Sequence, residues 1–471
     1  MNVFDSSAFS NWRIVVMFAI IAFVLLLANM IRRRVKLFKK LLFPTAIIAG
    51  FIGLGLKELV FALFLKDPIM QNDVSNFLNS ITYHTIALGF IAMGLKTVKK
   101  NEDGAVKGKP IKSGLLIVNT YIIQGILGIL ITVGLFYVFN FTEVFPHVGL
   151  LIPMAFGQGP GQVGNIGGIF GSHGFLGGEA GGRSYGLTIA TLGTLWACIG
   201  GIFYINKRQK DGVLTRVKEE EGQLVRTEDI ESIGEIPVSE AIDKMSMQII
   251  LVLVVYGISY LFMFGITKIV PEMFVGLIWG FNFIFGMIFA MLAKLLHNKL
   301  HQKKIIRRKY TNEYMLDRIT GVVFDFMIVT SIISIDIESI GNNTGIIVLL
   351  VLIGLTGGFL TYFYLKYVIK RLYPNYEHEA YAVFFGTLTG TASNGIALLR
   401  EIDPNFETPA ADDLVSGSAS AVLFGAPLLI ITGIIHQGGW YLWGSLAVLI
   451  FFFVVFSYFL MKEPKTDEAT K

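Results

Sequence analysis

Long apolar stretches recur along the whole chain, separated by short polar segments rich in Lys and Arg. A helix of about 20 residues spans a hydrocarbon core roughly 30 Å thick, so each stretch predicts a transmembrane helix. The predicted spans are residues 12–31, 41–65, 75–95, 113–139, 184–205, 246–267, 270–296, 317–335, 345–369, 413–435 and 440–461. This pattern predicts an all-α polytopic membrane protein of about eleven spans.

Basic residues cluster in alternate loops between the spans, at residues 32–40, 96–112, 207–210, 299–309 and 366–371. The positive-inside rule places these loops in the cytoplasm, with the N-terminus outside and the C-terminus cytoplasmic. The first apolar stretch has no basic segment or small-residue cleavage site ahead of it, so we expect a retained span in the cell membrane.

Two apolar segments, about residues 148–182 and 380–402, are interrupted by Gly, and the first also by Pro160. Pro removes a hydrogen-bond donor and Gly weakens a helix, so neither segment reads as one continuous helix. The alternation of basic loops also requires the first to enter and leave from outside and the second from inside. We therefore expect two re-entrant loops, whose exposed backbone is covered by protein or lines a wet cavity.

The topology divides the chain into two inverted five-span repeats. The first repeat covers residues 1–205, a charged cytoplasmic linker covers 206–245, the second repeat covers 246–435, and an extra span with its tail covers 436–471. Internal similarity agrees with this division. Gly157, Gly161 and Asn165 match Gly386, Gly390 and Asn394 with the same spacing.

The side chains near both breaks are neutral and carry oxygen or amide groups, and they form the predicted substrate site. Its members are Gln158, Gly159, Gly161, Gln162, Asn165, Thr389, Gly390, Thr391, Ser393 and Asn394. The N-termini of half-helices suit a carboxylate, and carbonyls and hydroxyls of the loops suit Na⁺. Alternatively, the glycines only allow close helix packing.

Ionisable groups inside the spans are further candidates, because burying charge in a membrane is costly. His84, Asp325, Thr387 and Asn394 are candidates for ion coupling, although a hydrogen-bonded core histidine is the favoured interpretation of His84. Arg183 and Arg400 border the broken segments and could meet a substrate carboxylate or anchor the topology.

Composition narrows the class of protein. Of the residues, 54% are hydrophobic and 15% charged, and mean hydropathy is +0.64. The formal charge of +5 lies in loops, so we expect no nucleic-acid partner. No pair of nucleophile and base, and no thiol or His cluster for a transition metal, occurs in the spans. We therefore expect a transporter with no cofactor, and not an enzyme.

Four segments resemble the bacterial glutamate:sodium symporter family: Ala155–Gly161, Thr389–Asn394, Leu42–Gly50 and Ile189–Gly193. Gln158 stands where the family has His, and Asn394 comes one residue sooner than in the family. The resemblance implies a homodimeric secondary active transporter that carries glutamate with Na⁺ by alternating access. Another small carboxylate or amino acid, H⁺ in place of Na⁺, and a passive channel are the alternatives.

Overall fold

The computed structural model describes residues 7–40, 43–64, 68–96, 109–214, 243–271, 275–306, 308, 310–403 and 408–462. Every regular element in these ranges is a helix. Most of the predicted linker, residues 215–242, lies outside the described residues. Helix α8 ends at Lys210 before it, and α10 begins at Lys244 after it. The chain forms two compact units.

Unit 1 comprises Met1–Lys100, Pro160–Asn165 and Glu220–Ile335. Its helices are α1 (Ser7–Arg34), α2 (Lys36–Lys40), α3 (Thr45–Leu63), α4 (Pro68–Leu95), α10 (Lys244–Ile266), α11 (Val275–Gly280), α12 (Asn282–Gln302) and α13 (Glu313–Ile333). Helices α4 and α13 pack on each other at the centre, with α3 on α13 and α12 on α4. Helix α1 packs on α3, and α10 on α12.

Unit 2 comprises Asn101–Gly159, Ile166–Glu219 and Asp336–Lys471. It contains α5 (Lys109–Tyr137), η1 (Val148–Leu150), α6 (Leu151–Gln158), most of α7 (Pro160–Ser172), η2 (Phe175–Gly177), α8 (Glu179–Lys210), α14 (Ile337–Gly341), α15 (Thr344–Leu372), α16 (Glu377–Thr389), α17 (Ala392–Arg400), α18 (Ala410–Phe424), α19 (Ala426–Ile434), η4 (Ile435–Gln437) and α20 (Gly439–Met461).

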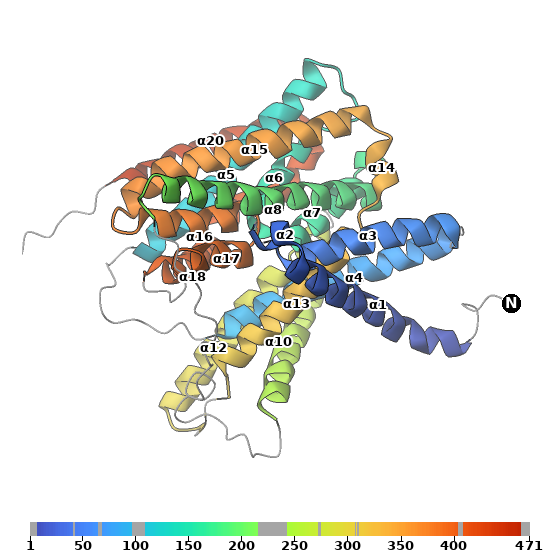
Figure 1. The fold of residues 1–471 in the computed structure, drawn as a ribbon, viewed down its shortest axis with the longest axis horizontal. Helices are drawn as coiled ribbons and strands as arrows, with labels where there is room; N and C mark the ends of the chain where they lie inside the picture. Colours follow the sequence, from blue (N-terminus) through green and yellow to red (C-terminus); the bar gives the residue numbers. More distant parts are fainter. Residues whose placement is uncertain are drawn as a thin grey trace, which may run out of the picture. The chain divides into compact units, whose positions relative to one another are not determined.

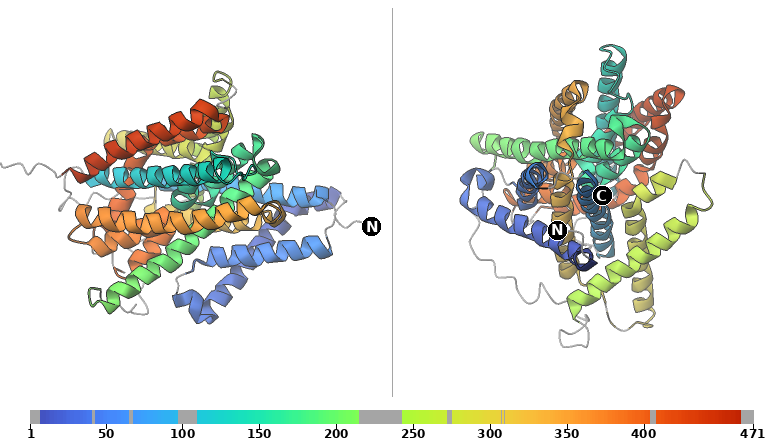
Figure 2. Two further views of the ribbon diagram at one scale, coloured as in Figure 1. Left: turned by 90° about the horizontal axis from the view of Figure 1, so that it is seen from above. Right: turned by 90° about the vertical axis from the view of Figure 1, so that its right-hand side faces the viewer.

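Helix α5 organises unit 2. It packs against α15, α18 and α20, and these helices can be followed in Figures 1 and 2. Small residues permit the closest approaches, as is common between membrane helices. A Cβ at Gly128 would lie 2.1 Å from the carbonyl oxygen of Gly149, so the backbones of α5 and η1 touch at this point.

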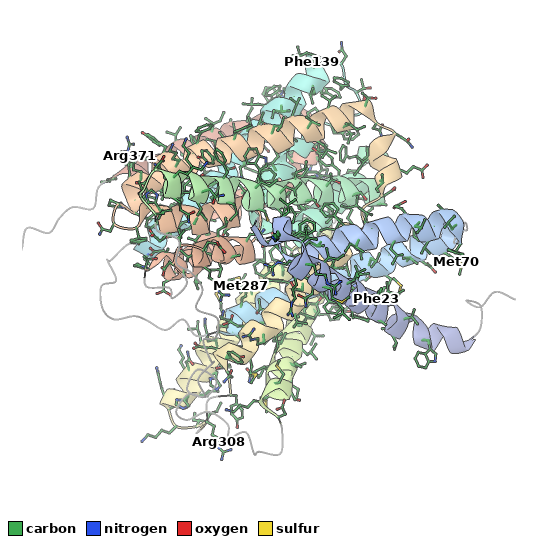
Figure 3. The ribbon with its side chains drawn as sticks, in the orientation of Figure 1. Phe23, Met70, Phe139, Met287, Arg308 and Arg371 are labelled. Carbon is green, nitrogen blue, oxygen red and sulfur yellow. The ribbon has the colours of Figure 1, made fainter. Side chains whose placement is uncertain are left out.

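Nine of the described helices are long and apolar enough to cross a membrane: α1, α3, α4, α5, α8, α10, α12, α15 and α20. Large apolar side chains on them face outward, as Figure 3 shows for Phe23 on α1, whose side chain is 59% exposed. Exposed apolar side chains on long helices suit contact with lipid. The chain is therefore an all-α, multi-pass membrane protein.

Three predicted spans differ in the structure. Residues 413–435 form a pair, α18 and α19, bent by 51°, because Pro427 follows Gly425 at the break. With this pair counted as one span, the described helices give ten. Residues 317–335 fall in α13, which carries Asp317, Arg318 and Asp325 and is not among the nine. Residues 270–296 are divided between α11 and α12 by a break at Phe281.

Candidate substrate and ion site

The first predicted break is present, and it lies at Gly159. Helix α6 ends at Gln158, and α7 begins at Pro160. Gly159 has φ 87° and ψ −177°, a backbone conformation that L-residues with a side chain rarely adopt. Pro160 lacks an N–H and starts the next helix. Gly159 and Pro160 together therefore interrupt the helix.

The second break lies at Gly390, for a different reason. Its φ of −134° needs no glycine, but a Cβ at this position would lie 2.3 Å from Asn394 Nδ2. Helices α16 and α17 pack closely against each other, and a Cβ at Gly395 would lie 2.3 Å from the carbonyl oxygen of Val383. The glycines of this segment allow a tight helical hairpin.

Unit 2 brings the two breaks together. Gly159 is the residue before α7 and Thr391 is the residue before α17. A Cβ at Gly159 would lie 3.2 Å from Thr391 Cγ2, so these two capping residues touch. Neither helix has a side-chain hydrogen bond at its cap. Within unit 2, the end of the first broken segment therefore lies beside the uncapped N-terminus of α17, and a free helix N-terminus favours an anion.

Polar groups without partners lie at the same place. Asn394 is only 5% exposed, and its Nδ2 is buried without a hydrogen-bond partner in the part of the chain that the structure describes. The Oγ1 atom of Thr391 is likewise buried without a hydrogen-bond partner among the described residues. Buried polar groups normally have partners, so an orphaned N–H donor in the first turn of α17 can bind an acceptor from a ligand. Gln158 is half-buried at the end of α6, and the side chain of Ser393 lies outside the described residues.

Two residues of α5 hold the broken helices, and neither was predicted from the sequence. Tyr121 donates from its hydroxyl to the carbonyl oxygen of Gly157 at 3.1 Å. Gln124 donates from Nε2 to the carbonyl oxygen of Leu388 at 3.0 Å and to Thr361 Oγ1 at 2.8 Å. Residues three apart on a helix share a face, so one face of α5 supports both breaks. The sequence feature that could have indicated them is the presence of two polar side chains, Tyr121 and Gln124, inside the apolar stretch 113–139.

Helix α8 approaches both segments at Gly193. A Cβ there would lie 2.4 Å from the carbonyl oxygen of Thr389 and 2.7 Å from Phe156 Cδ1. Thr389 is fully buried, and its hydroxyl donates to the carbonyl oxygen of Phe385 at 2.6 Å. The Thr389 hydroxyl thus donates its proton within α16 and not to a ligand.

The remaining predicted residues of α7 lie in unit 1. A Cβ at Gly161 would lie 2.5 Å from Ile86 Cδ1, so α7 begins against α4. Asn165 donates from Nδ2 to the carbonyl oxygen of Gly280 at 3.2 Å. Gln162 is 2% exposed, and its Oε1 is buried with no partner among the described residues.

The ion-coupling candidates are dispersed. His84 Nδ1 lies 2.7 Å from the hydroxyl of Tyr256 in unit 1, which is the ordinary arrangement of a hydrogen-bonded histidine. Asp325 is exposed on α13. The hydroxyl of Thr387 donates to the carbonyl oxygen of Val383 at 2.8 Å within α16. Of these candidates, only Asn394 combines burial with an orphaned donor.

The two arginines lie away from the break at Thr391. Arg183 Nη2 donates to Glu179 Oε1 at 2.5 Å, one turn earlier on α8. Arg400 is exposed at the end of α17. At 1.5 Å per residue it lies roughly 12 Å along the helix from Ala392. Neither guanidinium group therefore lies beside the capping residues Gly159 and Thr391.

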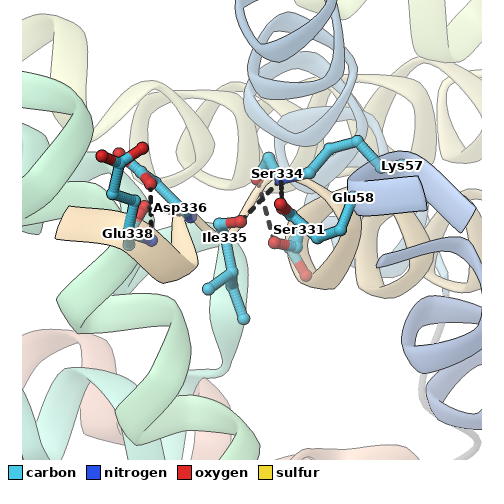
Figure 4. A network of polar contacts seen from close by, with 8 residues as sticks. Lys57, Glu58, Ser331, Ser334, Ile335, Asp336 and Glu338 are labelled. Carbon is cyan, nitrogen blue, oxygen red and sulfur yellow. Dashed lines mark hydrogen bonds and ion pairs between the residues drawn. The ribbon is translucent and has the colours of Figure 1, made fainter. Parts of the chain in front are cut away.

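Sequence reasoning also missed Lys57, a buried cation in α3. Lys57 Nζ donates to the carbonyl oxygen of Ile335 at 2.7 Å and lies 3.0 Å from Glu58 Oε1 (Figure 4). The carbonyl oxygen lies just beyond the C-terminus of α13, which favours a positive charge. Lys57 thus fastens the end of α13 to α3 within unit 1.

No known family model matches this sequence, and no curated protein matches it either.

Proposed function

We propose that this chain is a secondary active transporter that carries glutamate, or a similar anionic amino acid, inward by symport with Na⁺. The observation that carries the proposal is the contact between the capping residues Gly159 and Thr391. In unit 2 it brings the break at Gly159 to the uncapped N-terminus of α17 and the orphaned amide of Asn394, and a free helix N-terminus and an amide donor suit a carboxylate. We place the chain in the bacterial glutamate:sodium symporter family as part of this proposal.

Reciprocal helix packing supports the proposed inverted repeat. If α1, α3 and α4 correspond to α10, α12 and α13, then the α1–α3 contact repeats as α10–α12, and the α3–α13 contact repeats as α12–α4. In unit 2, α5 and α6 correspond to α15 and α16, and their contact recurs between those helices. Such repeats, with broken helices in corresponding places, are typical of secondary transporters.

Alternating access needs two bodies that can move with respect to each other. The division of the chain into two units, each with helices from both halves, supports this part of the proposal. In our proposal the protein is a homodimer in the cell membrane, with the N-terminus outside, the C-terminus in the cytoplasm and re-entrant loops at both breaks. It needs no cofactor besides the coupling ion, and it is not an enzyme.

Substitution of Asn394 by Leu tests the site. We expect radiolabelled L-glutamate uptake into proteoliposomes to fall at least about tenfold, because the substrate loses a buried donor whose hydrogen bond to a charged group contributes about 1.5–3 kcal/mol. Asn342→Leu is the matched control, since Asn342 is exposed beyond α14. Equal uptake by wild type and Asn394→Leu, in protein that is inserted and folded, would remove Asn394 from the site.

A further inference from the structure

The break between α11 and α12 in unit 1, at the start of a candidate membrane span, gathers polar groups. Helix α11 ends at Gly280, and α12 begins at Asn282. Two carbonyl oxygens at this break already have donors. The hydroxyl of Tyr83 donates to the carbonyl oxygen of Trp279 at 2.8 Å, and Asn165 Nδ2 donates to that of Gly280 at 3.2 Å.

Asn282, at the start of α12, has an orphaned oxygen. The residue is fully buried, and its Nδ2 donates to the carbonyl oxygen of Tyr83 at 3.0 Å. Rotating the amide would set its oxygen against that carbonyl, so the orientation is fixed by the hydrogen bond. Its Oδ1 is buried with no hydrogen-bond partner within the described ranges.

Gln162, which also lies in unit 1, carries a second orphaned oxygen. It precedes Asn165 by three residues on α7, so the two side chains share a face of that helix. Asn165 reaches Gly280, and the neighbouring Gly161 packs on Ile86, which is three residues beyond Tyr83 on α4. Gln162 is therefore held among the segments that carry Asn282 and its partner, and its own Oε1 is buried without a partner.

The buried oxygens Gln162 Oε1 and Asn282 Oδ1 have no hydrogen-bond donor among the described residues, so both are free to coordinate a cation. Hard oxygen ligands suit alkali and alkaline-earth cations. Divalent ions usually need carboxylates, and no group of three or more His, Cys, Asp or Glu side chains in the described part of the chain could hold a metal ion. Neutral ligands alone therefore favour a monovalent ion.

We propose that Gln162 Oε1 and Asn282 Oδ1 are ligands of a monovalent alkali cation, with Na⁺ as the ion to test, at the break between α11 and α12. Binding of the ion is independent of the proposed function, and only its role in coupling rests on that function. The site assigns Gln162 to the ion, whereas the sequence pattern had assigned it to the substrate.

The test is ion-dependent thermal stability of the purified full chain in lipid nanodiscs, without substrate. We expect the Tm to rise and saturate with NaCl, and not with choline chloride at equal ionic strength, because a ligand that binds the folded state stabilises it. Asn282→Leu and Gln162→Leu should each lower the apparent Na⁺ affinity by about tenfold or more, as loss of groups around a metal does.

Two further variants make the test decisive. Asn282→Asp keeps an oxygen and adds a negative charge, so it should bind Na⁺ more tightly than wild type, and it replaces Asn282→Leu if that variant does not fold. Asn394→Leu should lose glutamate uptake and keep the Na⁺ response. No Na⁺-specific shift in wild type, or an unchanged affinity in folded Asn282 and Gln162 variants, would overturn the ion site. A Na⁺ shift without glutamate uptake by wild type would keep the ion site and contradict the proposed function.

Discussion

Gly159 lies at the point where the two broken segments meet. Its positive φ excludes most side chains, and Thr391 leaves little room for a Cβ. Holding another residue in such a conformation costs about 1–3 kcal/mol. The same residue ends α6, precedes α7 and lies against Thr391, the residue before α17, so its conformation sets where the two broken segments meet in unit 2.

We predict that Gly159→Ala lowers glutamate uptake by about tenfold, through strain that shifts the capping residues. Gly134→Ala on α5 is the matched control, because no atom lies within 4 Å of a Cβ built there. Initial rates in proteoliposomes with equal amounts of inserted protein measure the effect. The same loss in both variants would indicate that any added methyl group disturbs this unit.

His147 makes stability depend on pH. Burial, and then the nearby His436 and His173, lower the pKa of His147 from its usual 6.5 to about 3. The rings of His173 and His436 stack with their centres 3.9 Å apart. Because the unfolded chain binds a proton at higher pH than the folded chain does, His147 destabilises the fold progressively as the pH falls below 6.5.

We predict that acidification from pH 7 to pH 5 lowers the Tm of wild type more than that of His147→Phe, because protonation of the unfolded state costs the fold about 2 kcal/mol at pH 5. The phenyl ring keeps the edge contacts with Phe145 and Phe170. Thermal unfolding in nanodiscs across this pH range measures the difference. Parallel pH curves for the two proteins would show that His147 does not titrate on unfolding.

The sequence was sufficient to locate the breaks and insufficient to find the residues that hold them. Gly159 and Pro160 stand out against an apolar background, and the parity of the basic loops demands a break near them. Gln124, by contrast, acts on Leu388, which is 264 positions away. Such a partnership depends on tertiary packing, and no local pattern encodes it. The same is true of Lys57 and Ile335.

At the element scale, α5 is the support of the candidate substrate site. It is a long helix with 67% of its apolar window buried, and it contacts elements of both halves. Its residues Tyr121 and Gln124 fix one carbonyl in each broken helix, and Asn119 donates to the hydroxyl of Tyr364 on α15 at 2.8 Å. These bonds hold the C-terminal ends of α6 and α16. Because α7 and α17 follow directly in the chain, the bonds also fix where those two helices begin.

We predict that Tyr121→Phe lowers Vmax/KM for glutamate by about fivefold, the value of one hydrogen bond of about 1 kcal/mol. The phenyl ring fills the same space, so insertion and folding should not change. Tyr137→Phe, at the exposed end of the same helix, should behave as wild type. Wild-type kinetics in Tyr121→Phe would show that the bond to Gly157 does not position the site.

Hydropathy predicted most of the long apolar helices correctly and failed where packing decides. The predicted span 413–435 is bent because Pro427 cannot donate to the preceding turn. Helix α13 has three charged residues in its predicted span, yet its C-terminal half is buried against α3 and α4. Asp317, Arg318 and Asp325 are exposed and lie outside this buried half, so the charged residues lower the mean hydropathy of a helix whose packed part is apolar.

At the scale of the whole molecule, the compact units do not follow the linear halves. Unit 1 takes α1, α3 and α4 from the first half and α10, α12 and α13 from the second, together with the first residues of α7, while unit 2 takes α6, α16, α17 and the rest of α7. Long-range packing within each unit, rather than chain order, makes this division. The candidate carboxylate site lies in unit 2, and the proposed ion ligands lie in unit 1.

The most direct measurement is uptake of radiolabelled L-glutamate by proteoliposomes with an imposed inward Na⁺ gradient, beside identical vesicles with choline outside. We predict accumulation above the external concentration that requires Na⁺ and collapses when an ionophore dissipates the gradient. Uptake that stops at equal concentrations would indicate a passive channel, and accumulation driven by a pH gradient without Na⁺ would indicate proton coupling. Either result, or no uptake by folded protein, would contradict Na⁺-coupled glutamate symport.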